Sequence, residues 1–337
     1  MAGLRGFRIV AWAVAFWAAA HGSGVAEVNE VRISFQYGLS YLPIHIVKSR
    51  HLIEKHAAAA GLGPVTVRFA QFNGGAAIND ALLAGDIDYG VAGIAPALTL
   101  WDKTRGGLDV RAVAALDSLD IDLTSNNTGV GSIKDFTDQD RIAVPAVKVS
   151  IQSVLLQIAA EKAFGEGHHD ELDRLTVSLN HPDATAAMLS RKAGISAHFV
   201  PPPYSVLQLS SPGIHKVTSS HQILGGPATL NVIYATARFR QQNPRLNVAV
   251  LAALREADDI IAGDKAAAVR IYVEEEKPGV PTEVIERVIT NPAAGGYSVT
   301  PFATEQIAHF LHRTGALRNA PSSWRDYFFP EVGEGGS

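Results

Sequence analysis

The chain has 337 residues, of which 47% are apolar and 18% are charged, and its formal net charge is −4. This length is too great for one small core and suits two domains of ordinary size, and the composition is that of a globular protein. The absence of cysteine excludes disulfides, thiolate metal sites, a thiol nucleophile and lipid attachment through an N-terminal cysteine. With a net negative charge the protein lacks the positive electrostatic potential that attracts nucleic acid, so we expect no nucleic-acid partner.

Residues 1–26 have the pattern of an export signal. Arg5 and Arg8 form a short basic region, residues 9–20 are uniformly apolar, and Gly24-Val25-Ala26 offers small residues to a signal peptidase. An N-terminal membrane anchor is the alternative, but this apolar run is shorter than the roughly 20 residues that span a bilayer as a helix. We therefore expect cleavage near Ala26 and a soluble, periplasmic mature protein.

A strand–loop–helix module occurs twice, with its internal spacing nearly unchanged. The strand patterns lie at 31–35 and 66–69 in the first copy and at 141–144 and 176–179 in the second. In each copy the helix that follows the second strand is ended by a glycine, Gly85 or Gly194. Strands that alternate with helices predict parallel sheets with helices on their faces. The repetition predicts two similar lobes, and hence a cleft between them.

The clearest helix of the second copy begins after Ser150, a good N-cap residue, and ends before Gly165. Before it, a long strand pattern at 112–123 and a turn-rich stretch at 124–131 suit a crossing from the first lobe into the second. Leu224-Gly225-Gly226-Pro227 marks the return, and a strand pattern follows at 229–235. These two connecting segments predict a hinge.

The rest of the chain is predicted to be helical and to pack on the first lobe. Asn243-Pro244 is a good helix start, and further helical patterns cover 264–275, 282–289 and 300–313, the last ended by Gly315. The predicted organisation is a signal peptide at 1–26, lobe I at 28–117 and 225–337, and lobe II at 118–224.

In an open parallel sheet a ligand lies beyond the carboxyl ends of the strands, where loops enter helix N-termini. This rule selects six loops: 36–41, 72–75 and 90–96 in lobe I, and 145–150, 180–183 and 198–204 in lobe II. The glycines of 90–96 let the backbone approach a ligand, and free N–H groups at the following helix favour an anion, although the same glycines could merely turn the chain. Lys148 is the only strong cation in the six loops, and it is either a contact for an acidic ligand or a solvated surface residue.

Aromatic residues are frequent in the six loops and predict aromatic cleft walls, formed by Tyr37, Tyr41, Phe72, Phe199 and Tyr204. The residues that we expect to bind the ligand are Gln36, Tyr37, Ser40, Tyr41, Asn73, Gly74, Gly93, Ile94, Ala95, Lys148, Val149, Ser150, His181, His198, Phe199 and Tyr204.

The twelve histidines do not form a metal site in the sequence pattern. His168-His169 and the other scattered histidines lack the helical i, i+4 spacing or the acidic companion of a zinc site. No Gly-x-Ser-x-Gly elbow and no phosphate-binding loop occur. We therefore expect no metal, no cofactor and no catalytic group, and we expect His181 and His198 to donate or accept hydrogen bonds in the cleft.

Several segments resemble the periplasmic solute-binding proteins of nitrate, sulfonate and taurine ABC importers. They are Gln36-Tyr37-Gly38, residues 81–90 followed by Gly93-Ile94-Ala95-Pro96, and the segments 132–136, 145–152 and 323–330. The resemblance covers most of residues 28–330. It implies an α/β, two-lobed type II periplasmic binding fold that acts as a monomer, closes on one small molecule and presents it to a membrane permease.

Three functions remain open. The first is a binding protein for a small organic anion such as a sulfonate, taurine or nitrate. The second is a binding protein for a neutral aromatic or pyrimidine ligand, and the third is an enzyme on the same fold that uses His181 or His198 as acid or base. The chain departs from the iron- and cysteine-dependent pyrimidine synthases of this fold because it has no cysteine. The unusual segment 195–203 prevents a ligand from being carried over by resemblance.

Overall fold

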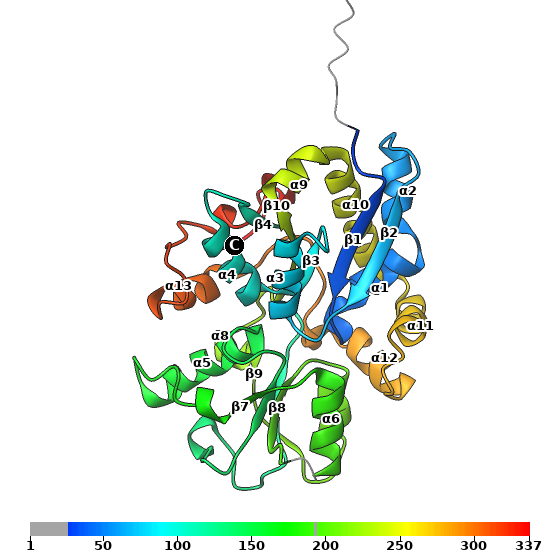
Figure 1. The fold of residues 1–337 in the computed structure, drawn as a ribbon. Coiled ribbons are helices and arrows are strands. Elements are labelled where there is room, and N and C mark those ends of the chain that lie inside the picture. The colour runs from blue at the N-terminus through cyan, green and yellow to red at the C-terminus, as the bar shows by residue number, and fades with distance from the viewer. Residues whose placement is uncertain (1–25, 192–193) are drawn as a thin grey trace, which may run out of the picture.

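The computed structural model describes residues 26–191 and 194–337, which form two α/β lobes (Figure 1). The expected signal peptide lies almost wholly outside the described residues, of which Ala26 is the first. The strands of lobe I are β1 (Glu30–Phe35), β2 (Thr66–Gln71), β3 (Gly90–Gly93), β4 (Val110–Asp117) and β10 (Asn231–Thr236). The strands of lobe II are β5 (Asp122–Ser125), β6 (Ile142–Val144), β7 (Thr176–Ser178), β8 (Ala197–Val200) and β9 (His215–Ser219).

The two sheets have the same strand order. In lobe I, β2 pairs with β1, β1 reaches β3 through a parallel bridge between Ile33 and Tyr89, and β3 continues to β10 and β4. In lobe II the order is β7-β6-β8-β5-β9. Strands β10 and β5, each next to the last strand in its order, run antiparallel to both of their neighbours. The β1–β2, β6–β7 and β6–β8 pairs are parallel. The predicted α/β two-lobed fold is confirmed, with one reversed strand in each otherwise parallel sheet.

The reversed strands follow from where the chain crosses between the lobes. Residues 118–121 join β4 to β5, and residues 225–230 precede β10. A strand that follows a crossing starts at the cleft and runs away from the cleft. The parallel strands end at the cleft, so the two directions are opposite. The expectation that 124–131 makes the first crossing was wrong. Leu119 and Ile121 are buried within the crossing, so their apolar side chains made 112–123 resemble one continuous strand.

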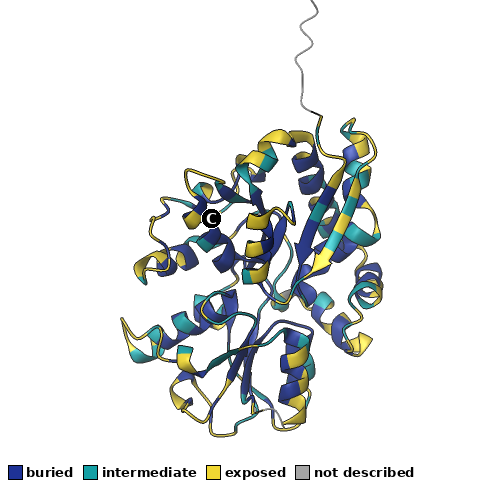
Figure 2. Cartoon of the chain, viewed as in Figure 1, coloured by how far each residue is buried: buried dark blue, intermediate teal, exposed yellow. Residues whose placement is uncertain are grey.

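Helices cover the faces of both sheets. Lobe I carries α1 (Leu42–Ser49), α2 (Leu52–Ala59), α3 (Gly75–Ala84), α4 (Ile94–Thr104), α9 (Ala237–Gln242), α10 (Pro244–Gly263), α11 (Lys265–Glu276), α12 (Thr282–Thr290) and α13 (Glu305–Arg313). Lobe II carries α5 (Ile151–Phe164), α6 (His181–Ser190), α7 (Tyr204–Leu209) and α8 (Ser220–Leu224). Short 3-10 turns lie at Leu39–Tyr41, Ile133–Asp135, Asp173–Leu175, Pro292–Ala294, Trp324–Asp326 and Pro330–Val332. Figure 2 shows exposed residues gathered on the outer helix faces and on the edge strand β2.

Local signals explain most helix boundaries. The Ser150 side chain accepts a hydrogen bond from the backbone N–H of Ser153 at the start of α5, and Gly165 follows its end. Helix α13 is shorter than predicted and begins at Glu305, because residues before it pair with Thr229 instead. Thr229 N–H donates to the carbonyl of Phe302 at 2.8 Å, and Phe302 N–H donates to Thr229 Oγ1 at 2.9 Å.

The two lobes are in contact, so the structure represents a closed arrangement. The Leu39 N–H of lobe I donates to the carbonyl of Pro202 in lobe II at 2.9 Å. The Arg313 guanidinium of α13 pairs with the Glu161 carboxylate of α5 at 2.7 and 2.5 Å. One apolar core also continues from α4 into α5. Closure therefore joins the lobes by backbone, ionic and apolar contacts.

Gly93 faces Ile151 of the other lobe with little room for a side chain, and its replacement should oppose closure. A Cβ atom added at Gly93 would lie 3.0 Å from Ile151 Cβ, although its φ of −54° suits alanine. We expect Gly93→Ala to shift the lobe equilibrium toward an open state by about 1–3 kcal/mol, because overpacking has this cost. Spin labels on Leu83→Cys and Leu189→Cys, both exposed, report the interlobe distance without competing thiols.

Gly263→Ala is the matched control, because a Cβ there meets nothing within 4 Å. The control should keep the parent distance distribution, whereas Gly93→Ala should lengthen it. Identical distributions for the two variants would contradict the closed contact.

Candidate functional site

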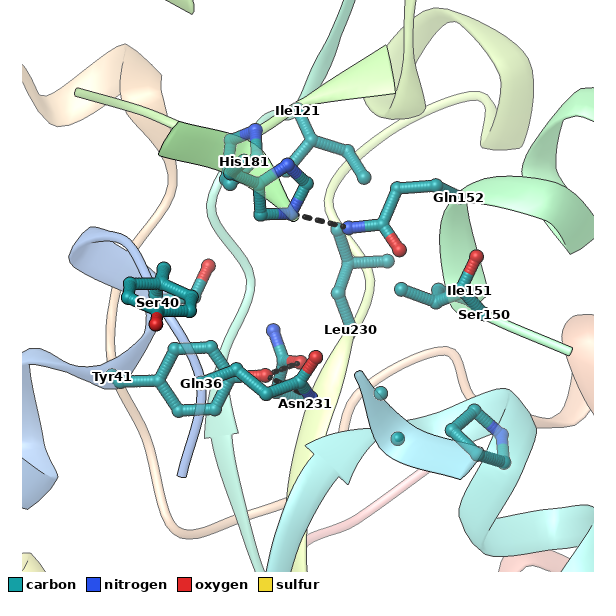
Figure 3. A pocket seen from close by; sticks show the side chains of 15 residues that line it. Gln36, Ser40, Tyr41, Ile121, Ser150, Ile151, Gln152, His181, Leu230 and Asn231 are labelled. Carbon is teal, nitrogen blue, oxygen red and sulfur yellow. Dashed lines mark hydrogen bonds between the residues drawn. The ribbon is translucent and has the colours of Figure 1, made fainter. Parts of the chain in front are cut away.

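A cavity of about 20 Å³ lies between the lobes, at the ends of the two sheets that face each other (Figure 3). Its lining comes from the loop after β1, from the first residues of α3 to α6, and from the two crossings. The lining residues are Gln36, Tyr37, Ser40, Tyr41, Gly75, Gly93, Pro96, Ile121, Ser150, Ile151, Gln152, His181, Pro201, Leu230 and Asn231. A space of this size admits about one water molecule. Entry of a larger solute therefore requires the lobes to separate.

The wall from lobe I is a chain of hydrogen bonds that ends on a carboxylate. Gln36 Nε2 donates to the Tyr41 hydroxyl at 2.8 Å, and this hydroxyl donates to Asn231 Oδ1 at 3.1 Å. Asn231 Nδ2 then donates to Asp117 Oδ1 at 2.7 Å. The direction of these bonds leaves the Gln36 carbonyl oxygen for other partners. The chain also holds the Asn231 amide in one orientation.

Asp117 places a titratable charge directly behind this wall. Burial raises the pKa of the Asp117 carboxyl to about 6, against hydrogen bonds from Asn231, Ser40 and the Leu119 backbone that favour the charged form. Since a buried carboxylate is disfavoured relative to a carboxylic acid, the group gains its proton near pH 6 instead of near pH 4. The lobe I wall is therefore negative at neutral pH and neutral in mild acid.

The wall from lobe II carries Gln152 near the start of α5 and His181 at the start of α6. Gln152 Nε2 lies 3.3 Å from His181 Nε2, and both face the lobe I wall across the cavity (Figure 3). Burial lowers the pKa of His181 to about 3, so its imidazole is neutral at physiological pH. Lobe II thus offers neutral hydrogen-bonding groups.

Four helices begin at the cavity: Gly75, Gly93, Ser150 and His181 each lie at or next to the start of α3, α4, α5 and α6, respectively. The first backbone N–H groups of a helix lack helical partners and carry partial positive charge, which stabilises an anion. Within residues 26–191 and 194–337, no lysine or arginine side chain lines this cavity. An anion bound here would therefore be held by helix N-termini and neutral donors.

Seven of the residues expected from the sequence line the cavity, namely Gln36, Tyr37, Ser40, Tyr41, Gly93, Ser150 and His181. Nine do not, namely Asn73, Gly74, Ile94, Ala95, Lys148, Val149, His198, Phe199 and Tyr204. The most consequential is Lys148. Its backbone has a φ of +64°, its side chain is 67% exposed, and its Nζ lies 3.9 Å from the Asp173 carboxylate. Lys148 points toward its own lobe and does not supply the expected charge.

Two of the predicted loops are partly strand, which removes several residues from the cavity. Residues 90–93 form β3, so Gly93 reaches the cavity while Ile94 and Ala95 at the start of α4 are buried in the core. His198 and Phe199 lie on β8 and are fully buried.

The remaining misplaced residues lie at the rim or behind the wall. Asn73 and Gly74 face lobe II at the rim, where Asn73 Oδ1 accepts from Asn180 at 3.4 Å and Gly74 lies against Pro145. Val149 closes the turn before α5 through its N–H and does not reach the cavity. The Tyr204 hydroxyl is 3.5 Å from Glu276. Of the predicted aromatic walls, only Tyr37 and Tyr41 line the cavity, because Phe199 is buried in the core and the half-buried Phe72 packs against it.

Two of the lining residues that the sequence prediction missed show why they were missed. Gln152 follows the Ser150 cap by two residues, so the helix start that was recognised could have revealed it. Asn231 is the first residue of the reversed strand β10. The amino end of this strand faces the cavity. A rule based on the carboxyl ends of strands cannot find such a residue. The other missed residues are Gly75, Pro96, Ile121, Ile151, Pro201 and Leu230.

Solved structures with the same fold include periplasmic binding proteins. The alkanesulfonate-binding protein SsuA from Xanthomonas axonopodis pv. citri, bound to MOPS, is 22% identical with a TM-score of 0.68, over 88% of this chain and 96% of that chain. The aliphatic sulphonate binding protein SsuA from Escherichia coli is 19% identical with a TM-score of 0.65, over 91% and 99%. The nitrate-binding protein NrtA from Synechocystis PCC 6803 is 15% identical with a TM-score of 0.69, over 91% and 87%. At these identities the likeness establishes the fold.

Two further observations concern the described part of the chain. None of its helices combines the length and the apolar character needed to span a bilayer. Its histidine, aspartate and glutamate side chains form no group of three or more that could hold a metal ion.

A comparison with curated protein sequences finds no match. The model of the NMT1-like family matches residues 24–273, which is more than half of the chain. The resemblance seen in the sequence is thus confirmed at the level of family and fold: the chain belongs to the NMT1-like family and has the fold of the periplasmic binding proteins.

Proposed function

We propose that this protein is the exported substrate-binding component of an ABC importer and that it captures a small organic anion, of the sulfonate type, between its lobes. The observation that carries the proposal is the convergence of four helix N-termini on one interlobe cavity. The names of the structural relatives agree with this ligand class, since they include binding proteins for alkanesulfonate and nitrate.

The anion would be bound without a neutralising side-chain cation. Each helix N-terminus contributes about 0.3–1 kcal/mol to the binding of a negative charge, and more where water is excluded. Gln152 and His181 add neutral hydrogen-bonding groups from lobe II, and Ser40 adds a hydroxyl from lobe I. In this arrangement the helix N-termini take the role that the sequence had suggested for Lys148.

Closure would couple binding to transport. The cavity lining comes from both lobes, so a bound solute contacts both and favours the closed arrangement. Movement would occur about the crossings at 118–121 and 225–230, with lobe I comprising 28–117 and 225–337 and lobe II comprising 118–224. The mature chain would act as a periplasmic monomer, without cofactor, and deliver the solute to the permease subunits.

A neutral aromatic or pyrimidine ligand is the second candidate, and the Asp117 carboxylate favours it. This buried negative group lies behind Asn231 and would repel an anion at neutral pH. An enzyme is less well supported, because a histidine with a pKa of about 3 is a weak general base at neutral pH.

A thermal-shift series on the mature chain tests the ligand class. Methanesulfonate, taurine, MOPS, nitrate, benzoate and cytosine are compared, and we expect the sulfonates to raise the Tm by a few degrees. A ligand at 100 times its Kd stabilises the protein by about 2.7 kcal/mol.

Gln152→Ala should weaken binding about tenfold, because it removes a polar group of the cavity. The exposed Lys148→Ala is the matched control and should bind as the parent does. Stabilisation by cytosine alone would support the second candidate instead.

The pH dependence of sulfonate binding gives a separate prediction. A unit charge roughly 8 Å from a bound anion repels it by about 2 kcal/mol at an effective dielectric constant of about 20. Protonation of Asp117 below its pKa of about 6 removes this repulsion, while methanesulfonate stays ionised. Affinity for methanesulfonate, measured by calorimetry, should therefore rise about 3- to 30-fold from pH 8 to pH 5. The Asp117→Asn variant should show no such rise, and an equal rise in both proteins would exclude Asp117 as its cause.

A further inference from the structure

A chain of buried polar side chains leads from the cavity into the interior of lobe II. His181 Nδ1 lies 3.0 Å from His198 Nε2, and His198 Nδ1 lies 2.8 Å from Gln208 Nε2. Gln208 is fully buried on α7, and its amide also contacts the hydroxyls of Thr124 and Thr185. We call His181, His198 and Gln208 the relay.

Both rings of the relay are neutral, so each has one N–H donor and one acceptor nitrogen. Burial lowers the pKa of His181 to about 3 and that of His198 well below its usual range. No carboxylate is hydrogen-bonded to either ring among the contacts of the described residues. A neighbouring group whose donor and acceptor atoms are known therefore decides which nitrogen of each ring carries the proton.

Gln208 supplies that fixed role. Its Oε1 lies 2.7 Å from Thr124 Oγ1, which is typical of an O–H···O bond, and its Nε2 lies 3.0 Å from Thr185 Oγ1, which is typical of an N–H···O bond. The amide nitrogen of Gln208 faces both Thr185 Oγ1 and His198 Nδ1, and it has two N–H groups to donate to them. Gln208 is therefore the donor, and His198 Nδ1 is the acceptor.

The remaining protons follow in sequence. Since His198 Nδ1 accepts, the proton of His198 is on Nε2 and is donated to His181 Nδ1. His181 Nδ1 then accepts, so the proton of His181 is on Nε2, the nitrogen nearest to Gln152 in the cavity wall. The Gln152 nitrogen at 3.3 Å is itself a donor, so this proton goes either to a ligand oxygen or to the carbonyl oxygen of Gln152 after its amide turns about the last side-chain bond.

We propose that His198 and Gln208 are positioning residues that hold His181 as the neutral Nε2–H tautomer, so that lobe II presents a fixed hydrogen-bond donor to an acceptor oxygen of the ligand. The ligand class in this inference rests on the proposed function. The cavity then favours a sulfonate, carboxylate or carbonyl oxygen at His181 and disfavours an ammonium group or another N–H donor. A mismatched group would leave the buried donor unpaired, which is costly.

Nuclear magnetic resonance of the ligand-free mature protein tests the relay directly. Long-range ¹H–¹⁵N correlations at pH 7 distinguish the two neutral tautomers and the imidazolium, and a through-hydrogen-bond N–N coupling identifies the His181–His198 pair without any substitution. We expect both rings to carry their proton on Nε2. An Nδ1–H tautomer or an imidazolium at either ring would overturn the proposal.

A variant series tests the consequence for recognition. His198→Phe should release the tautomer of His181, seen as averaged nitrogen shifts, and weaken methanesulfonate binding about 3- to 10-fold, the effect of one neutral hydrogen bond. His198→Gln, which can accept from Gln208 and donate to His181, should recover most of this loss. His215→Phe is the control, because His215 contacts the Val130 carbonyl in the same lobe and lies outside the relay.

The outcomes separate the two proposals. Nε2–H tautomers in a protein that does not bind sulfonates would support the relay and contradict the proposed anion ligand. Sulfonate binding with an Nδ1–H tautomer at His181 would support the proposed anion ligand and contradict the relay. If His198→Phe does not fold, the parent spectrum still decides the relay.

Discussion

The chain crosses between its two sheets at the sheet ends that face the cleft. This constraint explains which elements line the cavity. Because each crossing delivers the chain at the cleft, the strand that follows must run away from it, which reverses β5 and β10. The parallel strands run toward the cleft, and the helices that follow them begin there. Four helix N-termini and the first residue of β10, Asn231, are thereby brought to one small cavity. The position of the site is thus a property of the topology, and its chemistry is set by a few side chains.

The charges near the cavity are close to balance. Four helix N-termini at about 0.3–1 kcal/mol each favour an anion by about 1–4 kcal/mol in total. An ionised Asp117 opposes an anion by about 2 kcal/mol. Neither effect dominates, so the protonation of Asp117 and the neutral hydrogen bonds decide how tightly an anion is held. Without a lysine or arginine in the lining of the described cavity, binding of an anion would be moderate and readily reversed.

The sequence was sufficient for the fold and for part of the cavity lining, and the residues placed elsewhere have identifiable physical causes. Helix starts were predictable where a cap is local, as at Ser150, and so was the general location of the cleft. The first crossing was misplaced because Leu119 and Ile121 are buried as a strand would be. The direction of the Lys148 side chain depends on a left-handed backbone conformation in a tight turn. The hydrophobic periodicity of the sequence does not reveal such a conformation. Asn231 was missed because its strand enters the lobe in the reverse direction.

The relay shows how burial can replace charge as a source of specificity. A charged histidine at position 181 would attract any anion, but burial keeps this ring neutral and limits it to one directional bond. A neutral imidazole alone could present either a donor or an acceptor, so its choice must be made elsewhere. His198 transmits that choice from Gln208, whose amide is hydrogen-bonded to Thr124 and Thr185. Reversing the chain would require a rotation of the Gln208 amide and the transfer of both ring protons together. The donor at the cavity is therefore set by hydrogen bonds among side chains of lobe II alone.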